Sequence, residues 1–227
     1  MNIIAENISG IKSGLPRSVR LVAVSKTRPV NEIIEAFDTG QHLFGENRVQ
    51  ELLAKKDLLP QNIEWHLIGH LQTNKVKYVV PFISMIESVD SIKLLSLINE
   101  EARKAGRVVN CLLQIHIAEE ESKSGFTIDE LKEAGKSGIF SQLKNVGICG
   151  VMGMATFTDD KTQVRKEFKF LRSCFEDLRK DFFAMDKNFT EISMGMSGDY
   201  QIAVEEGSTI IRIGSLIFGE RTKQNNK

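Results

Sequence analysis

The sequence lacks several features that mark secreted, membrane-bound and nucleic-acid-binding proteins. Its three cysteines, Cys111, Cys149 and Cys174, are an odd number without a CxxC spacing, which argues against a disulfide framework or a thiolate metal site. Thirty basic residues balance thirty acidic ones, so we expect no general attraction to nucleic acid or to an anionic membrane. No apolar run is long enough to span a bilayer, and the N-terminal segment lacks the pattern of a secretion signal. A cytoplasmic protein is therefore expected.

Proline is scarce, with four residues, and no stretch rich in proline, glycine or serine divides the chain as a linker would. The 227 residues are 41% hydrophobic, which is enough for a sizeable core. This length suits one large α/β domain. We therefore expect residues 1–227 to form a single domain.

Short apolar runs alternate with longer amphipathic ones along the chain, a pattern typical of parallel β/α structure. Eight strands are predicted, over residues 20–25, 42–45, 64–68, 83–87, 108–117, 146–151, 189–193 and 209–213. The predicted helices include residues 3–12, 31–38, 48–56, 91–105, 128–138 and 163–183. Ser91 is the predicted N-cap of its helix.

The turn after the first strand favours a closed barrel over an open, doubly wound sheet. An open sheet of that kind usually carries a glycine-rich turn at this point. The sequence from Ser25 to Pro29 contains no glycine. With eight β/α units in this length, the sequence predicts the α/β class and a single (β/α)8 barrel of the TIM type.

Active groups of such barrels come from the carboxyl ends of the strands. The first strand runs into Lys26, which shares a face with Val22 and Val24, so its amine would project into the barrel mouth. Partial desolvation there would favour the neutral amine, the form that attacks an aldehyde. The alternative is an ordinary surface lysine just past a strand end.

The last strand carries a charged residue on an apolar face. Ile210, Arg212 and Gly214 share that face, and a buried guanidinium needs an acceptor because it keeps its charge. Gly214 and Ser215 then open a loop or short helix, and phosphate sites of barrels often follow strands seven and eight. Ser197 would lie at the same corner, where it would hold a phosphate oxygen or cap a helix. For Arg212, the alternative is a simple pair with a carboxylate.

Two further motifs follow the second and third strands. Asn47 would lie at the mouth, either as a hydrogen-bond donor to a ligand hydroxyl or as the N-cap of the next helix. His66 and His70 are four residues apart, but Gly69 and the β-rich start indicate a strand followed by a loop. Zinc would need further ligands and no third one is evident, so we predict no metal site.

Several segments occur together and in order: AVSKTRP, FGENRVQE, WHLIGHLQTNK, KSGF, GVMGMAT, ISMGMSGDYQIAVEEGST and RIGSLIFGER. Their combination, from about residue 20 to residue 221, resembles the YggS/PROSC family of pyridoxal 5′-phosphate (PLP) homeostasis proteins. Each segment alone is unspecific, whereas the combination is highly specific. The fold of this family resembles the N-terminal barrel of alanine racemase, which agrees with the eight predicted units.

The resemblance implies that PLP is the cofactor and that Lys26, in VSKT, forms a Schiff base with it. Ser197, in MGMS, and Gly214 and Ser215, in RIGS, match the phosphate-binding positions of the family.

Other positions of the family surround the pyridine ring. Arg212 matches the arginine that faces the ring nitrogen, and such an arginine keeps this nitrogen unprotonated, which makes PLP a poorer electron sink. Asn47 and His66 match positions near the ring. His116 is a departure, since many relatives have asparagine there.

The resemblance also implies a carrier or buffer of PLP, possessing no fast catalytic activity, with PLP-dependent apo-enzymes as recipients and a monomeric state. No second domain is expected that would supply an acid/base group opposite Lys26. The alternative is a slow, racemase-like PLP enzyme acting on amino acids, with His66 or Tyr200 as the second ionisable group. A third hypothesis is a barrel scaffold that binds no PLP.

Overall fold

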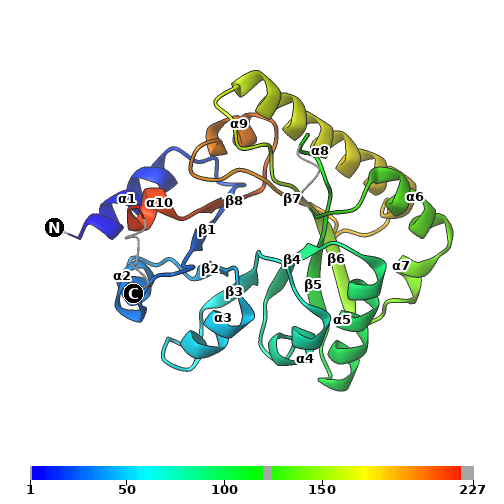
Figure 1. Cartoon of the computed structure of the whole chain (residues 1–227), viewed down its shortest axis with the longest axis horizontal. Coiled ribbons are helices and arrows are strands. Elements are labelled where there is room, and N and C mark those ends of the chain that lie inside the picture. Colours follow the sequence, from blue (N-terminus) through cyan, green and yellow to red (C-terminus); the bar gives the residue numbers. More distant parts are fainter. Residues whose placement is uncertain (1, 120–123, 221–227) are drawn as a thin grey trace, which may run out of the picture.

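The computed structural model describes residues 2–119 and 124–220, and within them eight parallel strands form a closed barrel (Figure 1). Each strand pairs with its neighbour in chain order, and β8 pairs with β1 to close the ring. The strands are β1 (Arg20–Val24), β2 (Leu43–Glu46), β3 (Glu64–Leu67), β4 (Met85–Val89), β5 (Val109–Gln114), β6 (Val146–Met152), β7 (Glu191–Ser193) and β8 (Ile210–Ile213). The predicted closed barrel is confirmed, and every predicted strand overlaps an observed one.

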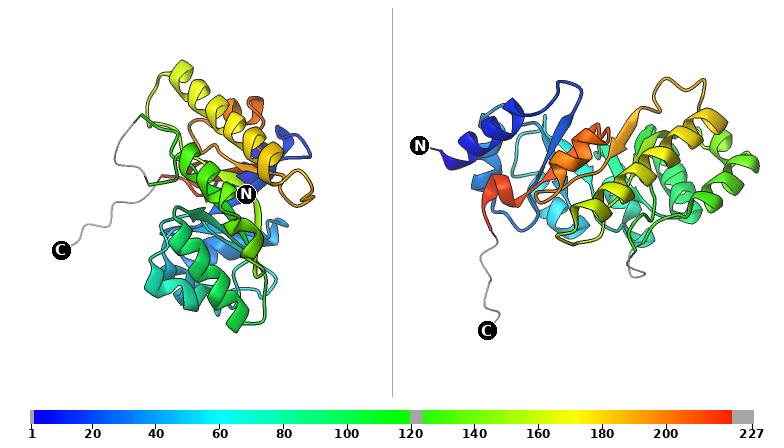
Figure 2. Two further views of the ribbon diagram at one scale, coloured as in Figure 1. Left: turned by 90° about the vertical axis from the view of Figure 1, so that its right-hand side faces the viewer. Right: turned by 90° about the horizontal axis from the view of Figure 1, so that it is seen from above.

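Helices surround this barrel (Figure 2). Those that the sequence predicts are α1 (Ile3–Ser13), α2 (Val30–Asp38), α3 (Val49–Lys56), α5 (Ile92–Lys104), α6 (Ile128–Lys136) and α8 (Lys161–Phe182). The remaining helices are short: η1 (Thr73–Lys75), α4 (Val76–Val79), α7 (Ile139–Gln142), α9 (Tyr200–Glu205) and α10 (Ser215–Phe218). One or two turns carry too little periodicity to predict bounds. A helix after Ser197 and a loop or short helix at Ser215 were nevertheless among the predicted alternatives. Within the described residues no helix combines the length and hydrophobicity that crossing a membrane requires.

Successive side chains of a strand point alternately into the barrel and toward the helices. Val22 of β1 and Ile210 of β8 belong to one buried cluster, together with Leu112 and Met152. Their neighbours along the strands, such as Ile211, belong to a second and larger cluster that includes the apolar faces of the helices. The predicted alternation on β1 and β8 is therefore confirmed.

Local capping also follows the prediction where α5 begins. Ser91 is the N-cap, and its hydroxyl oxygen accepts a hydrogen bond from the N–H of Leu94 at 3.3 Å. This bond satisfies one of the N–H groups that have no partner within the helix.

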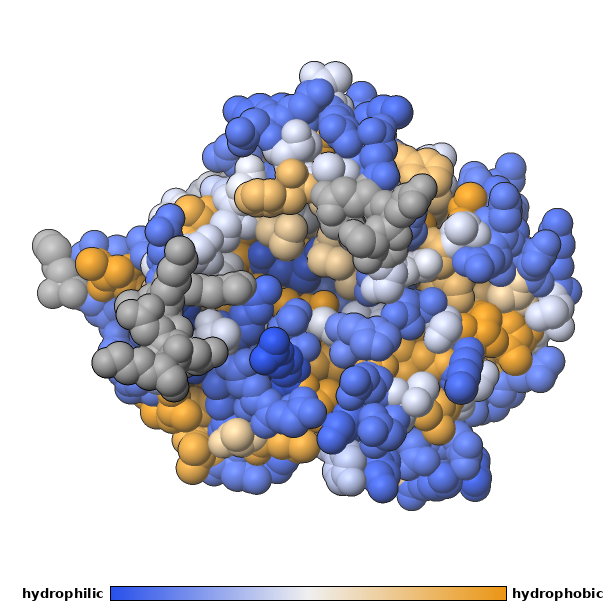
Figure 3. All heavy atoms as spheres, viewed as in Figure 1, coloured by the Kyte–Doolittle hydropathy of each residue, from blue (hydrophilic) through white to orange (hydrophobic). Residues whose placement is uncertain are grey.

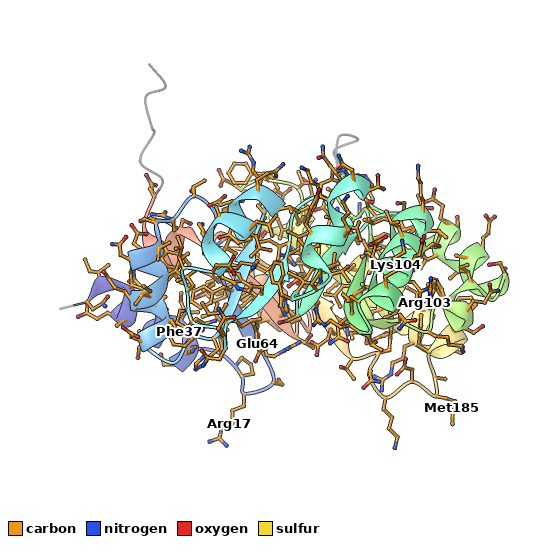
Figure 4. All side chains as sticks on the ribbon, turned by 90° about the horizontal axis from the view of Figure 1, so that it is seen from below. Arg17, Phe37, Glu64, Arg103, Lys104 and Met185 are labelled. Carbon is orange, nitrogen blue, oxygen red and sulfur yellow. The ribbon has the colours of Figure 1, made fainter. Side chains whose placement is uncertain are left out.

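The two ends of the barrel lie on opposite sides of the molecule. Figure 4 shows Arg17, Glu64 and Met185 on one side; Arg17 and Met185 precede β1 and β7, and Glu64 opens β3. That side therefore holds the amino ends of the strands. Figure 3 views the opposite side, where hydrophilic atoms line a hollow near the centre. This hollow marks the mouth at the carboxyl ends.

Gly150 allows β6 to approach β7 closely. Its φ is +152°, and a Cβ atom at this position would lie 1.8 Å from the carbonyl oxygen of Glu191. We expect Gly150→Ala to lower the free energy of unfolding by about 2 kcal/mol or more, because the strands must separate. Urea denaturation followed by circular dichroism measures this change.

Gly10 is the matched control, since a Cβ atom there meets nothing within 4 Å. Gly10 lies inside α1, so Gly10→Ala should raise the free energy of unfolding by roughly 0.5–1 kcal/mol. Equal stability of the two variants would contradict the close approach at Gly150.

Candidate functional site

Five of the sequence-predicted site residues lie at the carboxyl end of the barrel. Lys26 follows β1, Asn47 follows β2, and Ser197 lies between β7 and α9. Gly214 connects β8 to α10, and Ser215 is the first residue of that helix. All are half-buried except Ser215, which is exposed. The closed topology thus gathers at one mouth residues that are far apart in the sequence.

Beneath this mouth a buried polar network crosses the barrel interior. We call it the floor cluster; it consists of His66 on β3, Glu87 on β4, Ser193 on β7 and Arg212 on β8. Glu87 Oε2 accepts a hydrogen bond from the Ser193 hydroxyl at 2.6 Å, and Glu87 Oε1 lies 2.6 Å from His66 Nδ1. Arg212 donates to Ser193 Oγ at 2.5 Å and lies 3.6 Å from Glu87 Oε2. The cluster therefore links strands on opposite sides of the barrel.

Arg212 also contacts a backbone carbonyl group and lies near two carboxylates. Its second terminal nitrogen donates to the carbonyl oxygen of Gly153 at 3.0 Å, and the residue is only 4% exposed. Burial lowers the pKa of Arg212, an effect that the carboxylates of Glu87 and Asp199 oppose. A guanidinium keeps its proton under these conditions, so the site contains a permanent positive charge.

Glu87 supplies the matching negative charge. Burial would raise the pKa of its carboxyl, but the hydrogen bond and charge of His66, the charge of Arg212 and the Ser193 hydroxyl together lower it below the usual value. An ionised carboxylate only accepts hydrogen bonds, so the Nδ1 atom of His66 is the donor. Glu87 thereby orients both His66 and Arg212.

Arg212 and His66 were predicted from the sequence, whereas Glu87 was not. The expectation that a buried Arg212 needs an acceptor is confirmed, and a carboxylate is one of its partners, as the simpler alternative proposed. Glu87 had a signal of its own, since it ends the apolar run ISMIE as a single charged residue. Which strand would hold its partners could not be deduced from that run.

Two proposed caps are wrong. Helix α3 begins at Val49 after Arg48, and the N-cap has no side-chain hydrogen bond, so Asn47 does not cap it. Helix α9 begins at Tyr200 with Asp199 as its N-cap, and the Asp199 carboxylate accepts from the N–H of Met196 at 2.5 Å. Ser197 therefore lies in the turn before α9 and not at its N-cap.

The two histidines do straddle a strand and a loop, as predicted. His66 lies within β3, whereas His70 lies beyond it and pairs with Asp90 at 3.0 Å. Across residues 2–119 and 124–220, no group of three His, Cys, Asp or Glu side chains is arranged to hold a metal ion.

The corner between β8 and α10 exposes hydrogen-bond donors. In α10, the N–H groups of Ser215 and Leu216 come before the first hydrogen bonds of the helix, which Ile217 and Phe218 donate to the carbonyl oxygen of Gly214 at 3.0 and 2.9 Å. Gly214 lies against β1, since a Cβ atom on it would be 3.4 Å from the carbonyl oxygen of Val24. Gly195, with φ of +97°, bends the chain toward the turn that carries Ser197. Hydroxyl and N–H donors thus occur at the ends of β7 and β8.

Comparison with known proteins identifies the family. A model of the alanine racemase N-terminal domain matches residues 1–222. A pyridoxal phosphate homeostasis protein from Aquifex aeolicus is 38% identical over 203 residues, which cover 89% of this chain and 87% of the relative. The chain belongs to the pyridoxal phosphate homeostasis protein family. A human protein of the same name is 43% identical over 213 residues, which cover 89% of this chain and 76% of the relative.

Solved structures agree with this family and with the fold. PipY from Synechococcus elongatus PCC7942, solved with PLP bound, is 38% identical, with a TM-score of 0.87 over 95% of this chain and 100% of PipY. An alanine racemase from Clostridium difficile is 15% identical, with a TM-score of 0.75 over 99% of this chain and 57% of the racemase. This second likeness concerns the fold alone. It confirms the predicted likeness to the racemase barrel.

The lowered pKa of Glu87 predicts a pH dependence of stability. Its ionised form contributes stability that is fully present above the unfolded-state pKa of about 4.3 and is lost as the pH falls through the lower folded-state pKa. We expect Glu87→Gln to abolish this part of the dependence. At neutral pH the variant should be less stable by about 3 kcal/mol, because Arg212 loses its counter-charge.

Urea unfolding over a series of acidic to neutral pH values measures both effects. Glu176→Gln is the matched control, since Glu176 is 61% exposed and pairs with Arg172 on the surface of α8. The control should keep the wild-type profile. A wild-type profile in Glu87→Gln would contradict the role of Glu87 in the floor cluster.

Proposed function

We propose that this protein binds PLP at the barrel mouth as a Schiff base on Lys26. The observation that carries the proposal is the position of Lys26 after β1, at the same end of the barrel as the floor cluster and its permanent cation, Arg212. The PLP-bound structure of PipY, a relative that the chain matches almost end to end, supports the same cofactor.

The donors of the site fit the groups of PLP. We assign the phosphate to Ser197, Gly214 and Ser215, since hydroxyl groups and N–H groups at the start of a helix stabilise an oxyanion. The aldehyde would lie against the Lys26 amine.

The ring would lie between these two ends. We assign Arg212 to the pyridine nitrogen and Asn47 and His66 to the ring surroundings. The Nδ1 atom of His116, beyond the end of β5 at Gln114, is buried without a hydrogen-bond partner among the described residues, so this atom could bond to a ligand.

Arg212 bears on the chemistry of the bound cofactor. PLP supplies an electron sink for carbanions when its ring nitrogen is protonated. Arg212 keeps its own proton and is held by Glu87 and Ser193, so it would donate a hydrogen bond to that nitrogen without protonating it. The floor cluster therefore favours binding of PLP over fast carbanion chemistry.

We accordingly propose a role in PLP homeostasis, as a cytoplasmic carrier or buffer that passes the aldehyde to PLP-dependent apo-enzymes. The shared name of the relatives supports this role. We further propose that residues 1–227 act as one PLP-binding domain and that the protein is a monomer. Light scattering that finds a stable dimer at low concentration would contradict the monomer.

Lys26→Ala should abolish the imine absorbance that appears when PLP is added to the wild-type protein. Borohydride reduction followed by peptide mapping should locate the label on Lys26, because reduction turns the imine into a stable secondary amine. Lys104→Ala is the control, since Lys104 is half exposed on α5 and pairs with Glu100. A label spread over many lysines, or unchanged in Lys26→Ala, would refute the Schiff base at this position.

The carrier and the slow enzyme are separated by two measurements on the same PLP-loaded protein. We expect the PLP-loaded protein to reactivate a PLP-dependent apo-enzyme. We also expect that amino acids incubated with it for a long time keep their chirality. Slow racemisation that disappears in Lys26→Ala would instead support the enzyme. Tyr200→Phe then tests the proposed second ionisable group, with Tyr78→Phe on α4 as its control.

A further inference from the structure

A charged cluster behind β1 and β2 holds the turn that carries Lys26. We call it the Lys55 cluster; it consists of Ser25, Glu46, Glu51 and Lys55. The Lys55 ammonium of α3 donates to Glu46 Oε1 at 2.8 Å and to Glu51 Oε1 at 2.6 Å. Its third hydrogen bond goes to the backbone carbonyl oxygen of Ser25, at 2.8 Å. All three donors of the ammonium are therefore used.

The same cluster also contacts the residue that follows Lys26. The N–H of Thr27 donates a hydrogen bond to Glu51 Oε1, the atom that also accepts from Lys55. Lys26 is thus flanked by two backbone groups, the carbonyl of Ser25 and the N–H of Thr27. Both are bound to one ammonium–carboxylate pair.

The conformation of Thr27 is unfavourable without this support. Its φ is +65°, and among the residues that the structure describes it is the one non-glycine residue with a positive φ. Threonine is β-branched, and such residues clash with the backbone in the left-handed region. Strained backbone of this kind persists only where surrounding contacts enforce it. The hydrogen bond to Glu51 is such a contact.

The charged groups of the Lys55 cluster are largely buried, so they need hydrogen-bond partners at well-defined positions. The Glu46 side chain is 0% exposed and that of Lys55 is 10% exposed. Burial raises the pKa of Glu46, although the hydrogen bonds from Lys55 and Ser25 oppose the rise. The Ser25 hydroxyl donates to Glu46 Oε1 at 2.7 Å, whereas the buried Glu46 Oε2 has no partner within the part of the chain that the structure describes. A buried ion pair contributes little net stability compared with apolar residues, so its benefit lies in selecting one conformation.

We propose that the Lys55 cluster positions Lys26 by holding the turn from Ser25 to Thr27 in its left-handed form. Glu46, Glu51 and Lys55 are positioning residues, since they act through the backbone on either side of Lys26. The effect on cofactor binding rests on the proposed function. The effect on the turn itself does not, because it concerns hydrogen bonds of the protein alone.

Two variants test the cluster, Lys55→Met and Glu51→Ala, and they differ in how much they disturb the buried part of the protein. Lys55→Met removes three hydrogen bonds but leaves a buried carboxylate. Glu51→Ala removes the acceptor of Thr27, and Glu51 is partly exposed, so this variant tests the turn even where Lys55→Met fails to fold. Lys104→Met is the matched control on α5, where the ammonium pairs with Glu100 and Glu101 on the surface.

The first measurement is hydrogen exchange of the Thr27 amide in the protein without PLP. We expect exchange to accelerate roughly ten- to hundredfold in Glu51→Ala and Lys55→Met, as follows from losing a hydrogen bond to a charged group. Lys104→Met should exchange like the wild type. Unchanged exchange at Thr27 in Glu51→Ala would overturn the proposal.

The second measurement is the rate at which the imine absorbance develops at saturating PLP, which a general loss of stability does not lower while the protein stays folded. We expect a slower rate in Glu51→Ala, and partial recovery when Thr27→Gly is added, because glycine adopts a positive φ without strain. No difference between Glu51→Ala and the wild type would overturn the positioning role. A wild-type protein that forms no imine refutes the proposed function instead, and Thr27 exchange then still decides whether the cluster holds the turn.

Discussion

The buried ion pair between Glu87 and Arg212 is the constraint on which the interior of this barrel depends. A guanidinium cannot lose its charge, so an arginine inside a barrel requires an acceptor on a neighbouring or opposite strand. Glu87 reaches Arg212 from across the barrel, directly and through Ser193. The same carboxylate orients His66. The interior therefore changes from an apolar lower layer, which includes Leu112, to a polar floor beneath the mouth.

The proposed site lies between two networks that differ in what they control. The floor cluster places a cation, Arg212, beneath the mouth. In the proposed function, this cation would keep the pyridine nitrogen of the cofactor unprotonated. The Lys55 cluster lies behind the strands and acts on the backbone at Lys26. Under the proposed function, the floor cluster would influence the electronic state of the cofactor and the Lys55 cluster would direct the amine of Lys26.

Much of the fold was predictable because its determinants are local. The alternation of Ile210, Ile211 and Arg212 indicates which side chains enter the barrel, and Ser91 marks where α5 begins. The position of Lys26 and of Gly214 at the mouth follows from the strand ends alone. The caps proposed for Asn47 and Ser197 failed because a polar residue before a helix is equally compatible with several turns. The short helices α9 and α10 gave no periodic signal.

The sequence by itself determined the order of the elements, the inward faces of the strands and the set of residues that reach the mouth. These properties arise from alternation along single strands, and the motifs that resemble a known family add the cofactor expected there. The tertiary structure decided which charged residues meet. Glu87 with Arg212, and Lys55 with the carbonyl of Ser25, are partners because closure and register bring distant segments together. No local pattern encodes such contacts, since each depends on the placement of all the strands between the two partners.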